Sequence, residues 1–220
     1  TRCLSDWSSD VCSSDLSAEN TIFQQMAAQG QSIFVASGDA GAFDDSTHPQ
    51  TLSVDDPATQ PYVTAVGGTT LFLTTANTYR AESSWGSNGA GGGGGVSKIW
   101  ALPSWQASIS TNNNGESSTS RMIPDVALNS NPGTGYPIYF GGSWYAMGGT
   151  SAAAPIWAAF ATLVNQKLTS DGKARLGFAN PALYQVGRSA QYPVAFHDVD
   201  DGTNNLFYST APNFDLSTGW

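Results

Sequence analysis

The sequence predicts an α/β protein of one domain, or part of one. Two stretches carry this prediction. The first is a helix–strand–turn unit over residues 17–41, and the second is a helix over residues 152–164 that is apolar nearly all round. A helix without a polar face belongs in the interior of a domain. A helix that leads into a short apolar strand and a glycine-rich turn is typical of α/β architecture, and 220 residues fit one domain.

The first unit places a carboxylate at the end of a strand. Ser17 can cap a helix that Gly30 ends, and the strand that follows covers residues 32–37. The chain then turns through Gly38-Asp39-Ala40-Gly41, and ligands of α/β proteins lie at the carboxyl ends of such strands. Asp39 is therefore a candidate site residue, although an aspartate in such a turn is commonly structural.

The middle of the chain predicts further strands and loops. Residues 62–66 and 69–73 are strand candidates parted by two glycines, and residues 137–140 and 143–146 form a predicted hairpin. The unbroken glycines 91–95 favour a flexible surface loop, and residues 108–119 an exposed linker.

A serine follows that hairpin at the start of the apolar helix, in Gly148-Gly149-Thr150-Ser151. Unpaired amides and the helix dipole favour negative charge at this end of a helix, so Ser151 is placed to become an alkoxide nucleophile. Pro155 is expected in the first helical turn, where its missing N–H breaks no bond. The alternative for Ser151 is an ordinary N-cap.

Composition restricts the partners. The chain carries 8 Lys+Arg against 17 Asp+Glu, a formal net charge of −9, and its basic residues do not cluster. We therefore expect neither nucleic acid nor a membrane as partner, and no apolar run reaches the length of a membrane span. Scarce charge among many small polar residues suits a secreted protein that works in acid, although acidity alone can serve solubility.

The first sixteen residues differ from the rest. Residues 6–16 read DWSSDVCSSDL, which resembles the translation of a common sequencing-library adapter, and Thr1–Leu16 shows no apolar period. We expect residues 1–16 to be adapter-derived, with a Ser/Asp-rich leader as the alternative. Both cysteines fall in this segment, so no disulfide is inferred from them. Residues 17–220 are then the native part.

Four segments together resemble the sedolisin family of serine-carboxyl peptidases. They are FVASGDAGA (34–42), SVDDPATQPYVTAVGGTTL (53–71), RMIPDVAL (121–128) and GGTSAAAPIWAA (148–159), and they occur in family order. The resemblance implies a subtilisin-like fold, which is a doubly wound parallel sheet, and a Ser-Glu-Asp triad. By motif, Ser151 matches the nucleophile and Asp39 matches the aspartate that donates to the oxyanion.

The same resemblance sets the expected chemistry. A carboxyl group donates a hydrogen bond only while protonated, and a carboxylate base still works below about pH 5, so an acid endopeptidase or tripeptidyl peptidase is expected. The family's Glu and Asp lie four residues apart on a helix upstream of the FVASGD strand. Glu19 is the only native carboxylate before Asp39, and we read it as a first-turn helix acid. The chain is therefore expected to be a catalytic-domain fragment, truncated at both ends and inactive as given.

The resemblance also implies one bound Ca²⁺. The acidic run FHDVDDG (196–202) and the segment APNFD (211–215) resemble the sedolisin calcium site, and an acidic loop without a metal is the alternative. Calcium prefers six or more oxygen ligands. The matching ligands are the carboxylates of Asp198 and Asp215 and the backbone carbonyls of Val199, Ala211 and Asn213. Family members usually carry glycine where Ala211 and Asn213 stand.

The remaining titratable residues are expected to be structural. His48 and His197 lie outside the sequence context of a subtilisin histidine, and Asp125 is expected to order a loop with Arg121. Four further acids are predicted to be solvated turn residues: Asp44, Asp45, Asp55 and Asp56.

The resemblance further implies peptide or protein substrates, an N-terminal propeptide, a monomer and secretion. Two other functions stay open. One is a subtilisin-type protease fragment, against which Asp39 counts because subtilisins use an asparagine there. The other is a catalytically dead relative that binds peptides.

Overall fold

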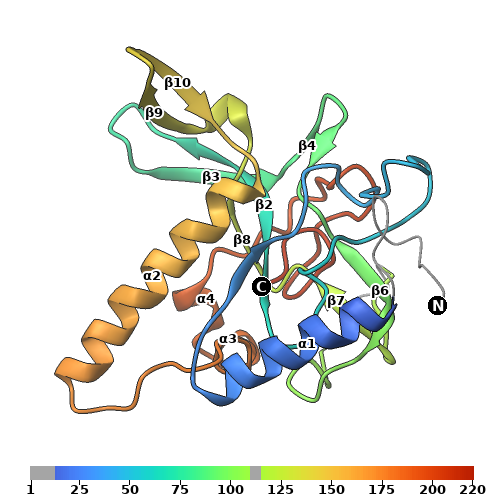
Figure 1. Cartoon of the computed structure of the whole chain (residues 1–220). Coiled ribbons are helices and arrows are strands. Elements are labelled where there is room, and N and C mark those ends of the chain that lie inside the picture. Colours follow the sequence, from blue (N-terminus) through green and yellow to red (C-terminus); the bar gives the residue numbers. More distant parts are fainter. Residues whose placement is uncertain (1–12, 110–114) are drawn as a thin grey trace.

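The computed structural model describes residues 13–109 and 115–220, so the adapter-like residues before Ser13 lie outside the described part (Figure 1). The elements are α1 Ser13–Ala28, β1 Phe34–Ala36, β2 Thr64–Leu73, β3 Tyr79–Ser84, β4 Gly86–Ser87, β5 Ala90–Gly91, β6 Gly95–Ala101, β7 Ser120–Ile123, β8 Val126–Asn129, η1 Pro132–Thr134, β9 Tyr136–Phe140, β10 Ser143–Met147, α2 Thr150–Ser170, α3 Asn180–Gly187 and α4 Tyr192–Ala195.

Three parallel strands form the centre of the molecule. β2 pairs with β1 on one side and with β8 on the other, both in parallel, and its second half continues into an antiparallel pair with β3. The carboxyl ends of β1 and β8 therefore lie at the same edge of the sheet. The predicted α/β class with a parallel sheet is confirmed.

Alternating residues of the strands face two separate cores. Phe34 of β1 and Val66 of β2 pack on α2, together with Val126 and Ala153. Val35 and its neighbours in β2 point to the opposite face, where they pack on the loop around Val54. Side chains alternate between the faces of a strand with period two, so short apolar strands supply both cores.

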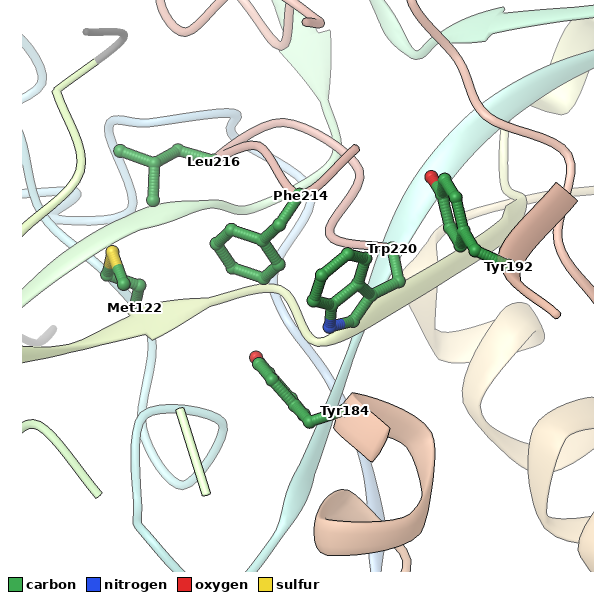
Figure 2. Packing of buried hydrophobic residues seen from close by; sticks show 6 residues of the cluster. All are labelled: Met122, Tyr184, Tyr192, Phe214, Leu216 and Trp220. Atoms are coloured by element: carbon green, nitrogen blue, oxygen red, sulfur yellow. The ribbon is translucent and has the colours of Figure 1, made fainter. Parts of the chain in front are cut away.

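A third core closes the C-terminal region. Figure 2 shows its six buried residues: Met122, Tyr184, Tyr192, Phe214, Leu216 and Trp220. Beside it the carboxylate of Asp125 binds both guanidinium nitrogens of Arg121, at 2.7 and 2.6 Å, and both side chains are fully buried. The Tyr184 hydroxyl and the Ala65 amide also donate to Asp125. The expected pair of Asp125 with Arg121 is confirmed, and it ties β7, β2 and α3 together.

Three local predictions differ from the structure. The helix expected from Ser17 begins at Ser13, and Leu16 within it is buried. The two strands expected around Gly67-Gly68 are one strand, because these glycines allow close packing: a Cβ on Gly67 would lie 2.6 Å from Pro124. The glycines 91–95 are buried rather than a surface loop.

Helix α2 is less buried than its composition predicts. Thr150, Ala153, Ala154 and Ala161 are its buried residues, whereas Phe160 is 54% and Leu163 63% exposed. The helix covers the sheet with its small residues and with Trp157, which stacks on Phe34, whereas Phe160 and Leu163 face outward. Among the described residues, no helix combines the length and apolarity that crossing a membrane requires.

Candidate active site

The ends of two parallel strands position the start of α2. The chain leaves β1 through Ser37 and Gly38, and Asp39 Oδ1 accepts hydrogen bonds from the Thr150 amide at 2.7 Å and from the Thr150 hydroxyl at 2.9 Å. At the end of β8, the Ser130 carbonyl accepts from the Gly149 amide at 2.6 Å. The structure therefore places Asp39 against Thr150, the residue before Ser151, although 112 positions separate Asp39 from Ser151 in the sequence.

Ser151 is exposed as the second residue of α2. Amides in the first turn of a helix have no partner within the helix, so negative charge that develops here is stabilised. Pro155 was expected in the first turn of the helix, but it is the sixth helical residue. It has no N–H to donate to the carbonyl of Ser151, four residues earlier, so the helix leaves that carbonyl without its usual backbone partner.

Two glycines allow the close approach. Gly149 adopts φ +93°, a conformation that side-chain-bearing residues rarely take, and a Cβ there would lie 2.7 Å from Asp39 Oδ2. Gly93 packs on the turn that carries Asp39: its amide donates to the Gly38 carbonyl at 2.8 Å, and a Cβ would lie 1.7 Å from the Ser37 carbonyl oxygen. The buried glycine run is thus the support of the Asp39 turn.

A carboxyl cluster lies behind this turn, contrary to the expectation of solvated turn residues. Burial, and then the charges of Asp55 and Asp39, raise the pKa of Asp44 to about 8. Burial raises the pKa of Asp55 to about 6. Asp44 and Asp55 are half-buried beside Asp39. Asp45 and Asp56 lie outside this cluster but are buried too, and Asp45 Oδ2 lies 2.9 Å from His48 Nδ1. The prediction that these acids are solvated was wrong, because segments distant in the chain can cover a turn that looks exposed in the sequence.

The base that would accept the Ser151 proton is not identified among the histidines. His48 is an exposed residue paired with Asp45, and His197 stacks on Tyr79 with ring centroids 3.9 Å apart. Both fit the structural role expected of them.

Helix α1 carries Asp15 and Glu19 four residues apart, but Glu19 is turned to another site. Glu19 accepts from Gln60 Nε2 at 2.8 Å, and its charge acts on Asp56, whose pKa is raised to about 7 mainly by burial. Gln60 precedes β2, at the end of the sheet opposite to Ser151. Glu19 is the seventh residue of α1, not a first-turn acid.

The predicted calcium ligands lie together in the C-terminal loops. Asp198 Oδ2 accepts from the Asn213 amide at 2.9 Å, and Asp215 Oδ2 accepts from the Ala211 amide at 3.0 Å. Asn213 adopts φ +69°, the left-handed region that favours glycine, and Val199 is buried next to Asp198. Within residues 13–109 and 115–220, no three side chains of His, Cys, Asp or Glu are grouped to hold a metal, so two carboxylates and backbone carbonyls are the available ligands.

The site thus combines a serine at a helix N-terminus with a nearby carboxyl group, on the carboxyl edge of a parallel sheet, which is an arrangement that a serine hydrolase can use. The chain belongs to the subtilase family, whose family model matches residues 4–180. It is 39% identical to kumamolisin from Bacillus sp. (strain MN-32) over 213 residues, which cover 93% of this chain and 37% of that protein. It is 37% identical to sedolisin from Pseudomonas sp. (strain 101), over 93% of this chain and 35% of that protein.

The solved structures agree with this membership. Pseudomonas sedolisin, described as a serine-carboxyl proteinase complexed with two molecules of pseudo-iodotyrostatin, matches with a TM-score of 0.81 and 37% identity, over 94% of this chain and 57% of that chain. The resemblance to sedolisins and the subtilisin-like fold are confirmed. The chain spans little more than a third of the length of these curated relatives.

Three contributors to the site were not found from the sequence. Thr150 binds Asp39, Gly93 supports the Asp39 turn, and Asp44 lies behind it. The glycine run was a visible signal, because five glycines in sequence allow backbone to pack on backbone. Nothing local marked Asp44.

Proposed function

We propose that this chain carries the nucleophile and the oxyanion half of a serine-carboxyl peptidase that hydrolyses peptide bonds in acid. Ser151 Oγ attacks the carbonyl carbon of the scissile bond while its proton passes to a carboxylate base. The oxygen that becomes negative then accepts a hydrogen bond from the protonated Asp39. The observation that carries the proposal is the pair of hydrogen bonds from Thr150 to Asp39. Because Thr150 directly precedes Ser151, these bonds hold the Asp39 carboxyl group close to the nucleophile.

The base is supplied by a Glu oriented by an Asp, as in the family that the chain resembles. Neither histidine serves instead, since both are engaged elsewhere. We propose that the 220-residue chain is inactive by itself, because Glu19, the only carboxylate between residue 17 and Asp39, binds Gln60 at the other end of the sheet.

The test is peptide hydrolysis at pH 4 by the complete product of the gene that encodes this chain, and by the 220-residue chain. We expect the complete product to cleave and its Ser151→Ala variant to lose about 10⁶ in kcat. Cleavage that persists in Ser151→Ala refutes the nucleophile, and Ser151-dependent cleavage by the 220-residue chain refutes its inactivity. A complete product that binds peptides without cleaving them is the dead relative, which remains the second candidate.

We further propose that one Ca²⁺ binds through Asp198, Asp215 and the carbonyls of Val199, Ala211 and Asn213. The donor set consists of oxygens alone, as calcium prefers. The two carboxylates are bonded to neighbouring amides of one loop, which supports a shared site.

Calcium binding predicts a shift in thermal stability. We expect 1 mM CaCl₂ to raise Tm relative to EDTA, because a ligand at about 100 times its Kd stabilises the folded state by about 2.7 kcal/mol. Asp198→Asn and Asp215→Asn should abolish the shift, and Asp200→Asn, on the exposed part of the same loop, should keep it. A Tm independent of calcium in the unsubstituted chain contradicts the site.

We also propose polypeptide substrates, an N-terminal propeptide, a monomeric state and secretion. Support comes from the peptidase resemblance, from the acidic composition, and from residues 17–220, which contain no cysteine.

A further inference from the structure

The β9–β10 hairpin, residues 136–147, presents a cluster of exposed aromatic and apolar side chains. It contains no charged residue, although the chain carries a net charge of −9. Its exposed large residues, each between 44% and 75% exposed, are Ile138, Tyr139, Phe140, Trp144, Tyr145 and Met147. Figure 1 shows the hairpin projecting from the body at the end of α2 that carries Ser151. An exposed apolar patch of this kind marks a binding surface.

The base of the hairpin is held firmly, so its tip is presented in a fixed direction. The Tyr136 hydroxyl donates to the Asn129 carbonyl at 2.8 Å, and Asn129 Nδ2 donates to the Thr134 carbonyl at 2.7 Å. A Cβ on Gly135 would lie 2.2 Å from the Met147 carbonyl oxygen, so the two strands are tightly packed where they leave the body. A rigid aromatic surface binds with little loss of conformational entropy.

Both faces of the hairpin are apolar, and both outer edges are open. Tyr139 lies opposite Trp144 with ring centroids 5.2 Å apart, and Ile138 lies opposite Tyr145. Within the described residues, β9 and β10 pair with each other and with no third strand. The free N–H and C=O groups of an edge strand can pair with an extended peptide, and side-chain surfaces beside them select apolar residues.

The position of the hairpin near Ser151 indicates which kind of molecule binds there. β10 ends at Met147, four residues before Ser151, and Trp144 is seven residues before it. Seven extended residues span at most about 25 Å, so an extended peptide bound at Ser151 reaches Trp144 within about seven of its own residues. A lipid surface would use neither the open strand edges nor the closeness to the nucleophile. We propose that this hairpin binds an apolar or aromatic segment of the polypeptide substrate, several residues from the scissile bond.

This inference rests on the proposed peptidase function, but binding tests it without catalysis. Two fluorescein-labelled peptides of equal length and charge are compared at pH 5 by anisotropy with the Ser151→Ala chain. One contains Phe, Tyr and Leu, and the other contains Ser and Gly at the same positions. We expect at least a 10-fold lower Kd for the aromatic peptide. The added substitutions Tyr139→Ser and Trp144→Ser should remove this preference.

The matched control is Leu163→Ser, an equally exposed residue of α2 outside the hairpin, which should keep the preference. Phe140→Ser at the tip, 75% exposed, gives a second variant whose folding does not depend on the Tyr139–Trp144 contact. Circular dichroism checks the fold of each.

Several results would overturn the inference. They are equal Kd values for the two peptides, no measurable binding of either, or a preference that survives the hairpin substitutions. Binding of phosphatidylcholine vesicles that needs Trp144, without peptide preference, would assign the surface to lipid. Loss of self-association in Trp144→Ser, seen by sedimentation velocity, would assign it to a second copy. Failure of the peptidase function appears separately, as hydrolysis by the complete gene product that does not need Ser151.

Discussion

Asp39 is held by two donors on one of its carboxyl oxygens, which leaves the other oxygen free to donate. Thr150 supplies both hydrogen bonds to Oδ1, and Oδ2 lies over Gly149, next to the nucleophile loop. A carboxyl group in this arrangement can carry its proton on Oδ2 without breaking a bond to Thr150. Thr150 therefore connects Ser151 with Asp39, although Thr150 itself is neither the nucleophile nor the oxyanion donor.

Two substitutions of Asp39 distinguish hydrogen-bond donation by its side chain from the effect of its charge. We expect Asp39→Ala to lower kcat/KM of the complete gene product about 10²–10³-fold, the usual cost of one lost oxyanion donor. Asp39→Asn should lower kcat/KM less than Asp39→Ala, since the side-chain Oδ1 of asparagine still accepts from Thr150 while its amide NH2 donates at every pH. Equal losses in the two variants would contradict donation by Asp39.

At the scale of elements, glycines decide how closely the turns approach. The run of glycines after β5 packs on the turn that follows β1, and it does so through backbone contacts that no side chain would allow. In the β9–β10 hairpin, by contrast, large side chains are exposed to solvent on two strands whose base is fixed by hydrogen bonds.

Gly93 tests the backbone contact. We expect Gly93→Ala to cost about 3 kcal/mol, at the upper end for overpacking, because its Cβ would fall 1.7 Å from the Ser37 carbonyl oxygen. Urea denaturation measures the loss. The control is Gly89→Asn, where nothing lies within 4 Å and where asparagine tolerates the positive φ. A Gly93→Ala chain as stable as the control would contradict this packing.

At the scale of the whole molecule, buried carboxyl groups set the pH of greatest stability. The folded chain raises the pKa of Asp44 to about 8, of Asp56 to about 7 and of Asp55 to about 6, in each case chiefly by burial. A raised carboxyl pKa means that the folded state holds the proton more tightly. This stabilisation is complete below about pH 4, where the unfolded chain is protonated too, and is lost as pH rises through the folded pKa values.

One carboxyl group acts in the opposite direction. Hydrogen bonds from Thr47 and His48 lower the pKa of Asp45 to about 2, so its contribution is lost as pH falls toward 2. We therefore expect Tm to be highest near pH 4 and to fall by at least about 5 °C between pH 4 and pH 8. Asp44→Asn should flatten the fall above pH 6, and Asp171→Asn, an exposed helix-end acid, should leave it unchanged. A Tm that rises from pH 4 to pH 8 would contradict these shifts.

The sequence by itself determined the α/β class, the helix after Ser151 and the hairpin before it, since periodicity and turn residues are local signals. The pairing of Asp39 with Ser151 was implied by the family resemblance. Tertiary structure alone decided that Gly67-Gly68 continue a strand, that the glycines 91–95 are buried, and that Asp44 lies in a carboxyl cluster. It also decided which large residues of α2 stay exposed. The physical reason is that burial and pKa depend on segments brought together from distant parts of the chain, which no window of neighbouring residues contains.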